Sequence, residues 1–289
     1  MKHIKFLIKR HKISLMLILS FLFCFNKTNG QSSQYKENIE IGVLGGTSYY
    51  LGDLNTKHFS ELTPMGSLVY RKNIDRRITY KGSALFTSIK ADERNSNDTI
   101  ASDRGLHFNT PIYEISGQLE FNFKPYDPGH PLYKWTPFVY TGLSMLYFNP
   151  TAENKNGEWV DLQPLGTEGQ GTSAFPERDK YSLVQFAIPM GGGVKIAVNE
   201  FFTFMIEYGV KKTFTDYLDD VSTTYPGKNI GAVNPYPIGM SNAAIEMSDP
   251  NGTHVLEDQR GDPEKNDWFA FTGITLSFRI NNNSMDCDY

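Results

Sequence analysis

Residues 112–124 decide the fold, and they read IYEISGQLEFNFK. Glu114 and Glu120 share one phase of a strict two-residue alternation, while Tyr113 and Leu119 share the other. Successive side chains of a β-strand point to opposite faces, so this pattern predicts a strand with one polar and one apolar face. Its length suits a tilted membrane-spanning strand of about 9–11 residues better than a soluble strand of about 5–6.

The same alternation recurs along the chain. The predicted strands are 39–51, 63–71, 78–87, 112–124, 135–148, 184–198, 202–214 and 273–280. The chain is polar on average, with a mean hydropathy of −0.40, yet 13% of it is aromatic. This combination is typical of a membrane β-barrel, because the apolar residues lie along one face of many strands and form no continuous apolar run.

The connections between these strands alternate strictly in length. The short ones are 72–77, 125–134 and 199–200, and the long ones are 52–62, 91–105, 149–180 and 215–267. Outer-membrane barrels combine short periplasmic turns with long extracellular loops. The sequence therefore predicts an all-β fold: a closed antiparallel outer-membrane β-barrel of about eight strands with its long loops outside. A soluble β-sandwich stays open as the alternative.

The first 30 residues have the three regions of a secretory signal peptide. Residues 2–12 are rich in basic side chains, and residues 13–25 form an apolar run. The small residues Thr28 and Gly30 precede the expected cleavage site. The expected organisation is a signal peptide, 1–30, and a single barrel domain, 31–289. The apolar run is short for an uncleaved anchor, and bulky Phe23 before Cys24 disfavours a lipoprotein.

Cleavage would remove six basic residues and no acid, which changes the formal net charge from −4 to about −10. An acidic chain of this kind is not expected to bind nucleic acid. Only Cys287 would remain, so neither an intrachain disulfide nor a thiolate metal cluster can form. The expected surroundings are outer-membrane lipid.

The polar phase of the strands is assigned to the barrel lumen. It carries Lys81, Glu114, Gln118, Glu120, Gln185, Lys195, Glu207, Lys211 and Arg279. An eight-stranded barrel is only wide enough for side chains to fill it, and an unpaired charge there is costly. We therefore predict a salt-bridged plug, with Glu207 and Lys195 as one pair on neighbouring strands. A narrow proton or ligand path is the alternative.

No catalytic or cofactor site is expected. The histidines outside the signal peptide show no paired metal spacing such as HExxH. No Lys-Ser/Thr pair follows Gly191–Gly193, so this run is not a phosphate loop, and small residues there let the strand pack closely. Ser88, His107 and Asp103 are the residue types of a lipid-modifying enzyme, but no motif fixes their geometry.

Two of the long connections carry local patterns. The Gly- and Pro-rich loop 152–178 has no packed-core pattern. In the segment 212–222, Thr215 or Asp216 could cap a short helix with Tyr217, Leu218 and Val221 on one face. Such a helix would cover the barrel mouth or bind a partner.

Two motifs carry a family resemblance. They are Tyr50, Gly52, Asp53 and Leu54 in the run Gly45–Leu54, and Glu207, Tyr208 and Gly209 followed by Thr213, Asp216, Tyr217, Leu218, Asp219 and Asp220 in the run up to Ser222. The chain resembles, over about residues 35–280, the PorG family of Bacteroidetes outer-membrane barrels, components of the type IX (Por) secretion system. The resemblance implies a non-enzymatic anchor for a periplasmic ring built from the PorK lipoprotein and PorN.

Such an anchor would need a docking surface among the short turns. In the turn 125–134, three prolines restrict the backbone, and Tyr126 and Tyr133 are of the residue type that dominates interface hot spots. These tyrosines could equally belong to the aromatic girdle at the membrane boundary. The alternative function is a stand-alone barrel that acts through its outer loops as an adhesin, a small-solute binder or a lipid-modifying enzyme.

Overall fold

The structure, a computed structural model, describes residues 35–94, 96, 98–227 and 235–280. The predicted signal peptide and the two cysteines lie outside these residues. The chain divides into two units, Met1–Tyr35 and Lys36–Tyr289, and the second contains the fold described below. Among the described residues, no helix is both long and apolar enough to cross a membrane.

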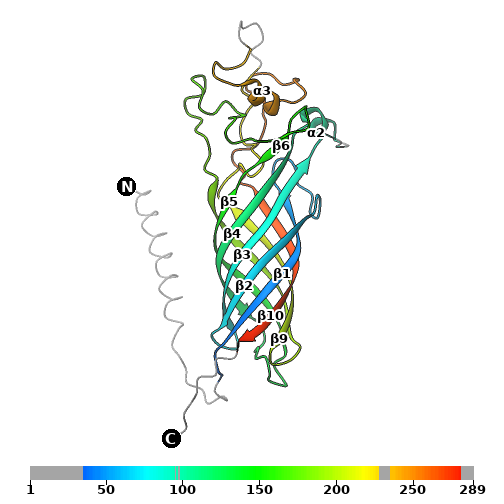
Figure 1. Cartoon of the computed structure of the whole chain (residues 1–289), viewed down its shortest axis with the longest axis vertical. Helices are drawn as coiled ribbons and strands as arrows, with labels where there is room; N and C mark the ends of the chain where they lie inside the picture. Colours follow the sequence, from blue (N-terminus) through cyan, green and yellow to red (C-terminus); the bar gives the residue numbers. More distant parts are fainter. Residues whose placement is uncertain (1–34, 95, 97, 228–234, 281–289) are drawn as a thin grey trace, which may run out of the picture. The chain divides into compact units, whose positions relative to one another are not determined.

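Eight long antiparallel strands form a closed barrel (Figure 1). They are β1 (Asn38–Leu51), β2 (Thr63–Asn73), β3 (Ile78–Asp92), β4 (His107–Asn122), β5 (Trp135–Phe148), β8 (Val184–Ala197), β9 (Phe202–Thr213) and β10 (Trp268–Ile280). Each strand pairs with its neighbour along the chain, and β10 closes the barrel by pairing with β1 from Ile39↔Ile280 to Leu51↔Trp268. The predicted fold class is confirmed.

The predicted strands and connections are close to the observed ones, and β10 begins at Trp268, directly after the predicted connection 215–267. β3 runs on to Asp92 and β4 begins at His107, and this extension beyond the alternating runs 78–87 and 112–124 leaves a connection, 93–106, that agrees with the predicted 91–105. The extension carries Asn109, which pairs with Thr151 of the short strand β6 (Thr151–Glu153). The extended ends of β3 and β4 stay in the sheet because they pair with each other as far as Asp92↔His107.

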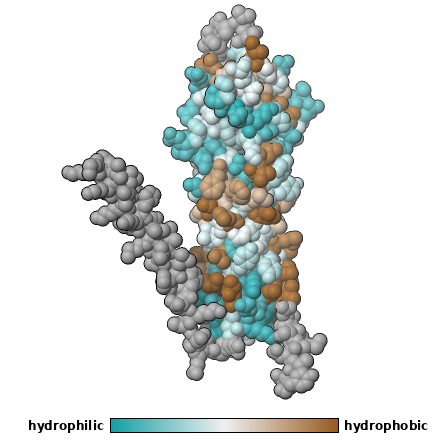
Figure 2. All heavy atoms as spheres, turned by 90° about the vertical axis from the view of Figure 1, so that its left-hand side faces the viewer, coloured by the Kyte–Doolittle hydropathy of each residue, from teal (hydrophilic) through white to brown (hydrophobic). Residues whose placement is uncertain are grey.

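The outward face of the barrel is apolar, as the alternation requires. On β4 the exposed side chains include Tyr113, Ile115, Leu119 and Phe121, between inward residues that are buried. Figure 2 shows apolar side chains gathered on the barrel wall below a mostly hydrophilic loop region. At a rise of about 3.3 Å per residue and a tilt of about 40°, Tyr113 and Phe123 are roughly 25 Å apart along the barrel axis, the height of an outer-membrane apolar band.

The long connections fold together above the barrel into what we call the lobe. It consists of the described parts of 52–62, 93–106, 149–183 and 214–267, and it contains β6, β7 (Trp159–Asp161), α2 (Thr99–Arg104) and α3 (Asn242–Ser248). In α2, Asp98 caps the N-terminus by accepting from the Ile100 N–H, and Gly105 ends the helix in the left-handed region with φ 61°.

Two predictions about these connections are wrong. The loop 152–178 has a packed core, in which Ala152 and Leu162 bury themselves against Met247 of α3. The segment 212–222 forms no helix; after β9 it runs through bends into the barrel mouth. In both segments, side chains are buried by contacts with residues far away in the sequence. A local sequence pattern cannot predict this burial, which overrides local propensity.

Candidate functional site

An ion-pair network crosses the barrel lumen. Lys81 Nζ lies 2.7 Å from Glu207 Oε2, and Lys195 Nζ lies 2.5 Å from Glu120 Oε2. Arg71 joins these pairs, with Nε 3.1 Å from Glu120 Oε1 and Nη2 3.4 Å from Glu207 Oε1. All five side chains are at most 3% exposed, so the network fills this section of the lumen.

A separate lumen pair lies nearer the mouth. Lys211 Nζ is 2.5 Å from Glu114 Oε1, and both side chains are buried. Gln118 is also buried and donates to Ser116 Oγ at 2.7 Å, whereas Gln185 is only half-buried and bonds the Ser182 carbonyl near the rim. The structure thus places Lys81, Glu114, Glu120, Lys195, Glu207 and Lys211 in the lumen as paired charges.

Three details of the lumen differ from the prediction. Glu207 does not pair with Lys195, because Lys195 lies opposite Met205 on β9 and its ammonium reaches across the lumen to Glu120 on β4. Arg279 lies outside the network, at the short-turn end, where it donates to the Pro128 carbonyl at 2.9 Å. Arg71 was not predicted, although its place on the inward phase of β2 with Met65 and Val69 is the signal that could have found it.

Glycines of the strands make room for an aromatic side chain in the lumen. A Cβ at Gly209 would stand 2.1 Å from the Tyr140 hydroxyl, and one at Gly191 would stand 2.6 Å from it. Both glycines therefore allow the Tyr140 ring to lie inside the barrel. Lys81 Nζ lies over this ring, 4.8 Å from its centroid. Close packing is thus the role of these small residues, one of which belongs to the second motif.

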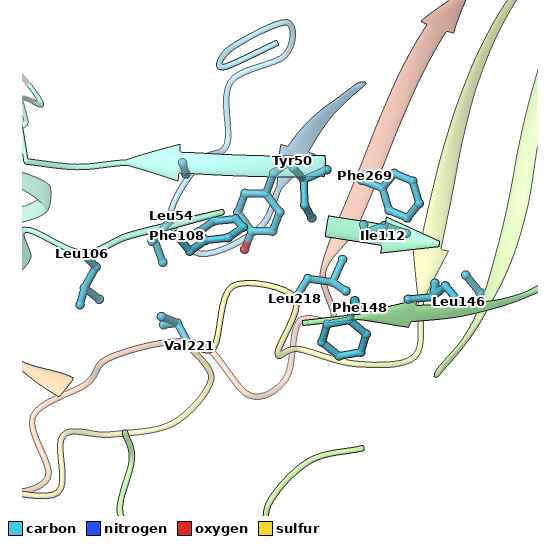
Figure 3. Close-up of a cluster of buried hydrophobic side chains, with 13 residues drawn as sticks. Tyr50, Leu54, Leu106, Phe108, Ile112, Leu146, Phe148, Leu218, Val221 and Phe269 are labelled. Carbon is cyan, nitrogen blue, oxygen red and sulfur yellow. The ribbon is translucent and has the colours of Figure 1, made fainter. Parts of the chain in front are cut away.

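The two family motifs meet at the barrel mouth. The Tyr50 hydroxyl lies 2.6 Å from Asp219 Oδ2 and 2.6 Å from Asp267 Oδ1, and all three residues are buried. We call these three residues the mouth triad. Leu54 of the first motif and Leu218 of the second belong to the apolar cluster around it (Figure 3). Residues about 170 positions apart are thereby joined where the lobe sits on the barrel.

The two short contacts in the mouth triad need one proton in addition to the phenol proton of Tyr50. A phenol has one proton to donate, and the Tyr50 oxygen is within hydrogen-bond distance of two carboxylates. The second short contact therefore requires that either Asp219 or Asp267 is protonated. Burial raises the pKa of both carboxyls, and the negative charge of Asp219 raises the pKa of Asp267 further.

Other motif residues hold the same junction. Gly52 has no room for a side chain, since a Cβ would stand 2.1 Å from Asp267 Oδ1. Asp53 Oδ2 accepts the Asp262 N–H at 2.8 Å, and Thr213 Oγ1 donates to the Asp267 carbonyl at 2.7 Å. On the outer wall, the Tyr208 hydroxyl lies 2.9 Å from that of Tyr49. The motifs thus build the attachment of the lobe to the barrel.

A second buried charge cluster, which we call the lobe core, lies within the lobe. Arg260 Nη1 is 3.0 Å from Glu168 Oε1 and donates to the Asp220 carbonyl at 2.5 Å. Asp220 accepts from Thr167 Oγ1 at 2.5 Å, and Tyr217 stacks on Tyr181 with centroids 4.5 Å apart. Glu168 and Arg260 were not predicted, because they lie in loops that carry no periodic pattern.

The lobe should weaken as pH rises. Burial raises the pKa of Asp216 to about 9 and that of Asp220 to about 6, against about 3.9 in an unfolded chain. A carboxyl whose pKa is raised on folding contributes stability that is present below the unfolded pKa and is lost as pH passes through the folded pKa. We expect faster limited proteolysis of the lobe at pH 9 than at pH 5, with the difference reduced by Asp216→Asn and unchanged by Asp179→Asn at an exposed position. An equal difference in both variants would contradict this assignment.

The turn 125–134 packs against the turns 74–77 and 198–201 at the short-turn end, and we call the surface of these three turns the platform. Tyr126 is 1% exposed and its hydroxyl lies 2.7 Å from Thr203 Oγ1, so it lies inside the barrel end and presents no surface. Tyr133 is half-buried between His130, stacked at 4.4 Å, and the Arg76 guanidinium, 5.0 Å from its ring. The turn also carries a large apolar side chain that is exposed, Leu132, at 78%.

The residue types of a lipid-modifying enzyme are not assembled. Ser88 pairs with Pro111 on β4, four positions from His107, which corresponds to about 13 Å along the strand. The His107 ring instead contacts the Glu153 backbone. Within the part of the chain that the structure describes, no group of three or more His, Cys, Asp or Glu side chains is arranged to hold a metal ion.

Three solved structures with a similar barrel are distant from this chain in sequence. The attachment invasion locus protein Ail of Yersinia pestis matches with a TM-score of 0.37 and 9% identity over 86% of this chain and 100% of that one. The neisserial surface protein A matches with a TM-score of 0.39 and 10% identity over 84% and 97% of the two chains. OprG of Pseudomonas aeruginosa matches with a TM-score of 0.35 and 7% identity over 87% and 99%.

A search of curated proteins found no match. Among protein families, one profile matches residues 16–163, which is just over half of the chain, and it is described as a domain of unknown function. Its matched range contains the first motif and β1 to β7. The protein is a closed antiparallel β-barrel that belongs to the family DUF6089.

Proposed function

We propose that this barrel is a non-enzymatic anchor of the type IX secretion machinery, as its resemblance to the PorG family implies. In this proposal the short-turn end faces the periplasm and docks a ring of the PorK and PorN type. The observation that supports it best is the platform at that end, which is rigid and carries exposed apolar side chains. Rigid surfaces lose little conformational entropy when they bind.

Contacts between the turns give the platform its rigidity. Arg76 of the turn 74–77 forms an ion pair with Asp127 at 3.3 Å. Arg279 holds the Pro128 carbonyl, and Gly129 packs against Glu200 of the next turn. The exposed apolar residues at this end include Ile74, Phe201 and Leu132. They could bury apolar area against a partner, which drives most protein association.

The closed lumen supports an anchor over a conduit. Arg71, Lys195 and Glu120 are almost fully buried and paired across the barrel. A path for solutes would have to break these ion pairs, each of which leaves an uncompensated charge when one partner moves away. Transport through the barrel therefore fits the geometry less well than a scaffolding role.

The docking proposal predicts a large effect at Leu132. Leu132→Asp should lower co-purification of the ring proteins from native membranes at least tenfold, because a buried charge replaces an apolar contact. Tyr133→Ala should act in the same direction. Ile100→Asp is the matched control, since Ile100 is 74% exposed at the opposite, long-loop end. Folding is checked by the heat-dependent electrophoretic mobility of the barrel.

Undiminished co-purification by a folded Leu132→Asp variant would exclude this platform as the docking site. If deletion of the gene leaves cargo secretion intact, the anchor function itself fails. The stand-alone alternative, in which the lobe acts as an adhesin or binder, would then take its place. The ordered lobe, with its own buried charge cluster, is the feature that favours this alternative.

A further inference from the structure

A cavity of about 590 Å³ opens on the outside of the barrel, where the wall meets the lobe. Leu51, Trp268 and Lys212 form its side toward the barrel, and Asp53, His58 and Glu264 are among its lobe residues. This volume lies in the range of small-molecule sites, about 300–1,000 Å³. The cavity is separate from the lumen network and from the platform at the other end of the barrel.

Strand register places three of these residues in one row on the outer wall. Leu51 of β1 lies directly opposite Trp268 of β10, and Trp268 lies opposite Lys212 of β9. Trp268 has the same phase as Ile274, Leu276 and Phe278, which are exposed on the wall. Residues directly opposite one another share a face of the sheet, so Lys212 also projects outward.

Toward the middle of the barrel the wall below this row is aromatic. The Tyr49 ring lies 5.1 Å from that of Phe59, which also approaches the Tyr208 ring at 6.2 Å. The Phe59 side chain is 57% exposed. Its backbone has φ 58°, a conformation that is rare for a bulky residue. The loop 52–62 therefore holds an aromatic side chain against the lipid-facing wall, at the height where interfacial aromatics are common.

The cavity carries an available positive charge. Among the residues that the structure describes, Lys212 forms no ion pair, and its Nζ lies 5.4 Å from the Trp268 ring centroid. The other lysine of the cavity, Lys265, is held by Asp262 at 2.6 Å. Asp53 and Glu264 provide carboxylates, of which Asp53 already accepts the Asp262 N–H.

We propose that this cavity binds the head group of a phosphate-bearing membrane lipid. Lys212 would contact the phosphate, the carboxylates would accept hydrogen bonds from the donors of the head group, and the acyl chains would lie along Phe59 and the wall below. A cation beside an interfacial tryptophan, above an apolar wall and next to carboxylates, matches the order of chemical groups in such a lipid.

The test uses the purified full chain in detergent micelles and counts bound lipid by native mass spectrometry. The probes are dioleoyl phosphatidylethanolamine, dioleoylglycerol without the phosphate, and glycerophosphoethanolamine without the acyl chains. We expect the first to bind well above the other two. Lys212→Gln should weaken its binding about fivefold, because it removes the ammonium that would contact the lipid phosphate.

Lys90→Gln is the matched control. Lys90 also lies on a barrel strand near the lobe, but it is already paired with Glu61 at 3.0 Å and lies outside the cavity. Its replacement should leave lipid binding unchanged. Equal binding of dioleoylglycerol, equal binding of glycerophosphoethanolamine, or equal effects of the two lysine variants would each overturn the proposal.

Discussion

Arg71→Met should destabilise the barrel by about 3–5 kcal/mol, measured by chemical unfolding of the protein in lipid vesicles or detergent. Arg71 is buried and lies between Glu120 and Glu207, both of which are also buried. Methionine has nearly the same reach but no charge, so two carboxylates would lose a shared cation in a closed lumen. Removal of one partner from a buried ion pair typically has a cost of this size.

The neighbouring Lys72→Met variant is the control for Arg71. Lys72 forms an ion pair with Glu37, but both side chains are about half exposed. Pairs of this kind contribute about 0–1 kcal/mol. If the two variants unfold at the same denaturant concentration, the lumen network does not stabilise the barrel. Arg71→Met combined with Glu120→Gln should cost less than the sum of the single changes, because the two residues are in contact.

The second large effect is expected in the lobe. Arg260→Met should unfold or loosen the lobe at a cost of about 3–5 kcal/mol, while the barrel strands stay folded. Arg260 is 2% exposed and uses its guanidinium fork to bind Glu168, the Asp220 carbonyl and the Ser248 carbonyl. Methionine can make none of these hydrogen bonds, and lysine lacks the planar fork.

Hydrogen exchange resolved by peptide separates the two parts of the molecule. In Arg260→Met the amides of 214–227 and 242–262 should exchange faster, while those of β1 to β5 keep their protection. Lys265→Met provides the control, since Lys265 is 80% exposed and should have little effect. Loss of protection in the strands to the same degree would show that the lobe and the barrel unfold as one unit.

The lumen network and the mouth triad are two separate charge clusters, and they stabilise different parts of the molecule. The lumen network ties β2, β3, β4, β8 and β9 across the barrel, so it closes the interior. The mouth triad instead ties the ends of β1 and β10 to the segment after β9. The raised pKa values of Asp219 and Asp267 make this junction sensitive to alkaline pH.

The barrel could be predicted from local sequence patterns alone. Alternation with a period of two assigns every strand residue to the lipid or to the lumen, and this assignment needs only neighbouring residues. The order of short and long connections then fixes the topology, because sequential antiparallel strands pair with their neighbours. The inward charges followed from the same alternation, and so could Arg71, which shares its phase with Met65 and Val69.

Which charges pair with one another could be known only from the folded barrel. In a narrow lumen side chains reach across the axis as easily as to the next strand, so Lys195 finds Glu120 on β4 and leaves Glu207 to Lys81 and Arg71. The lobe is the stronger case. Leu218 and Asp219 are buried by segments more than a hundred residues away, and this burial replaces the helix that local capping residues would favour. Long-range contacts of this kind leave no periodic trace in the sequence, so the site at the barrel mouth could be found only once the chain was folded.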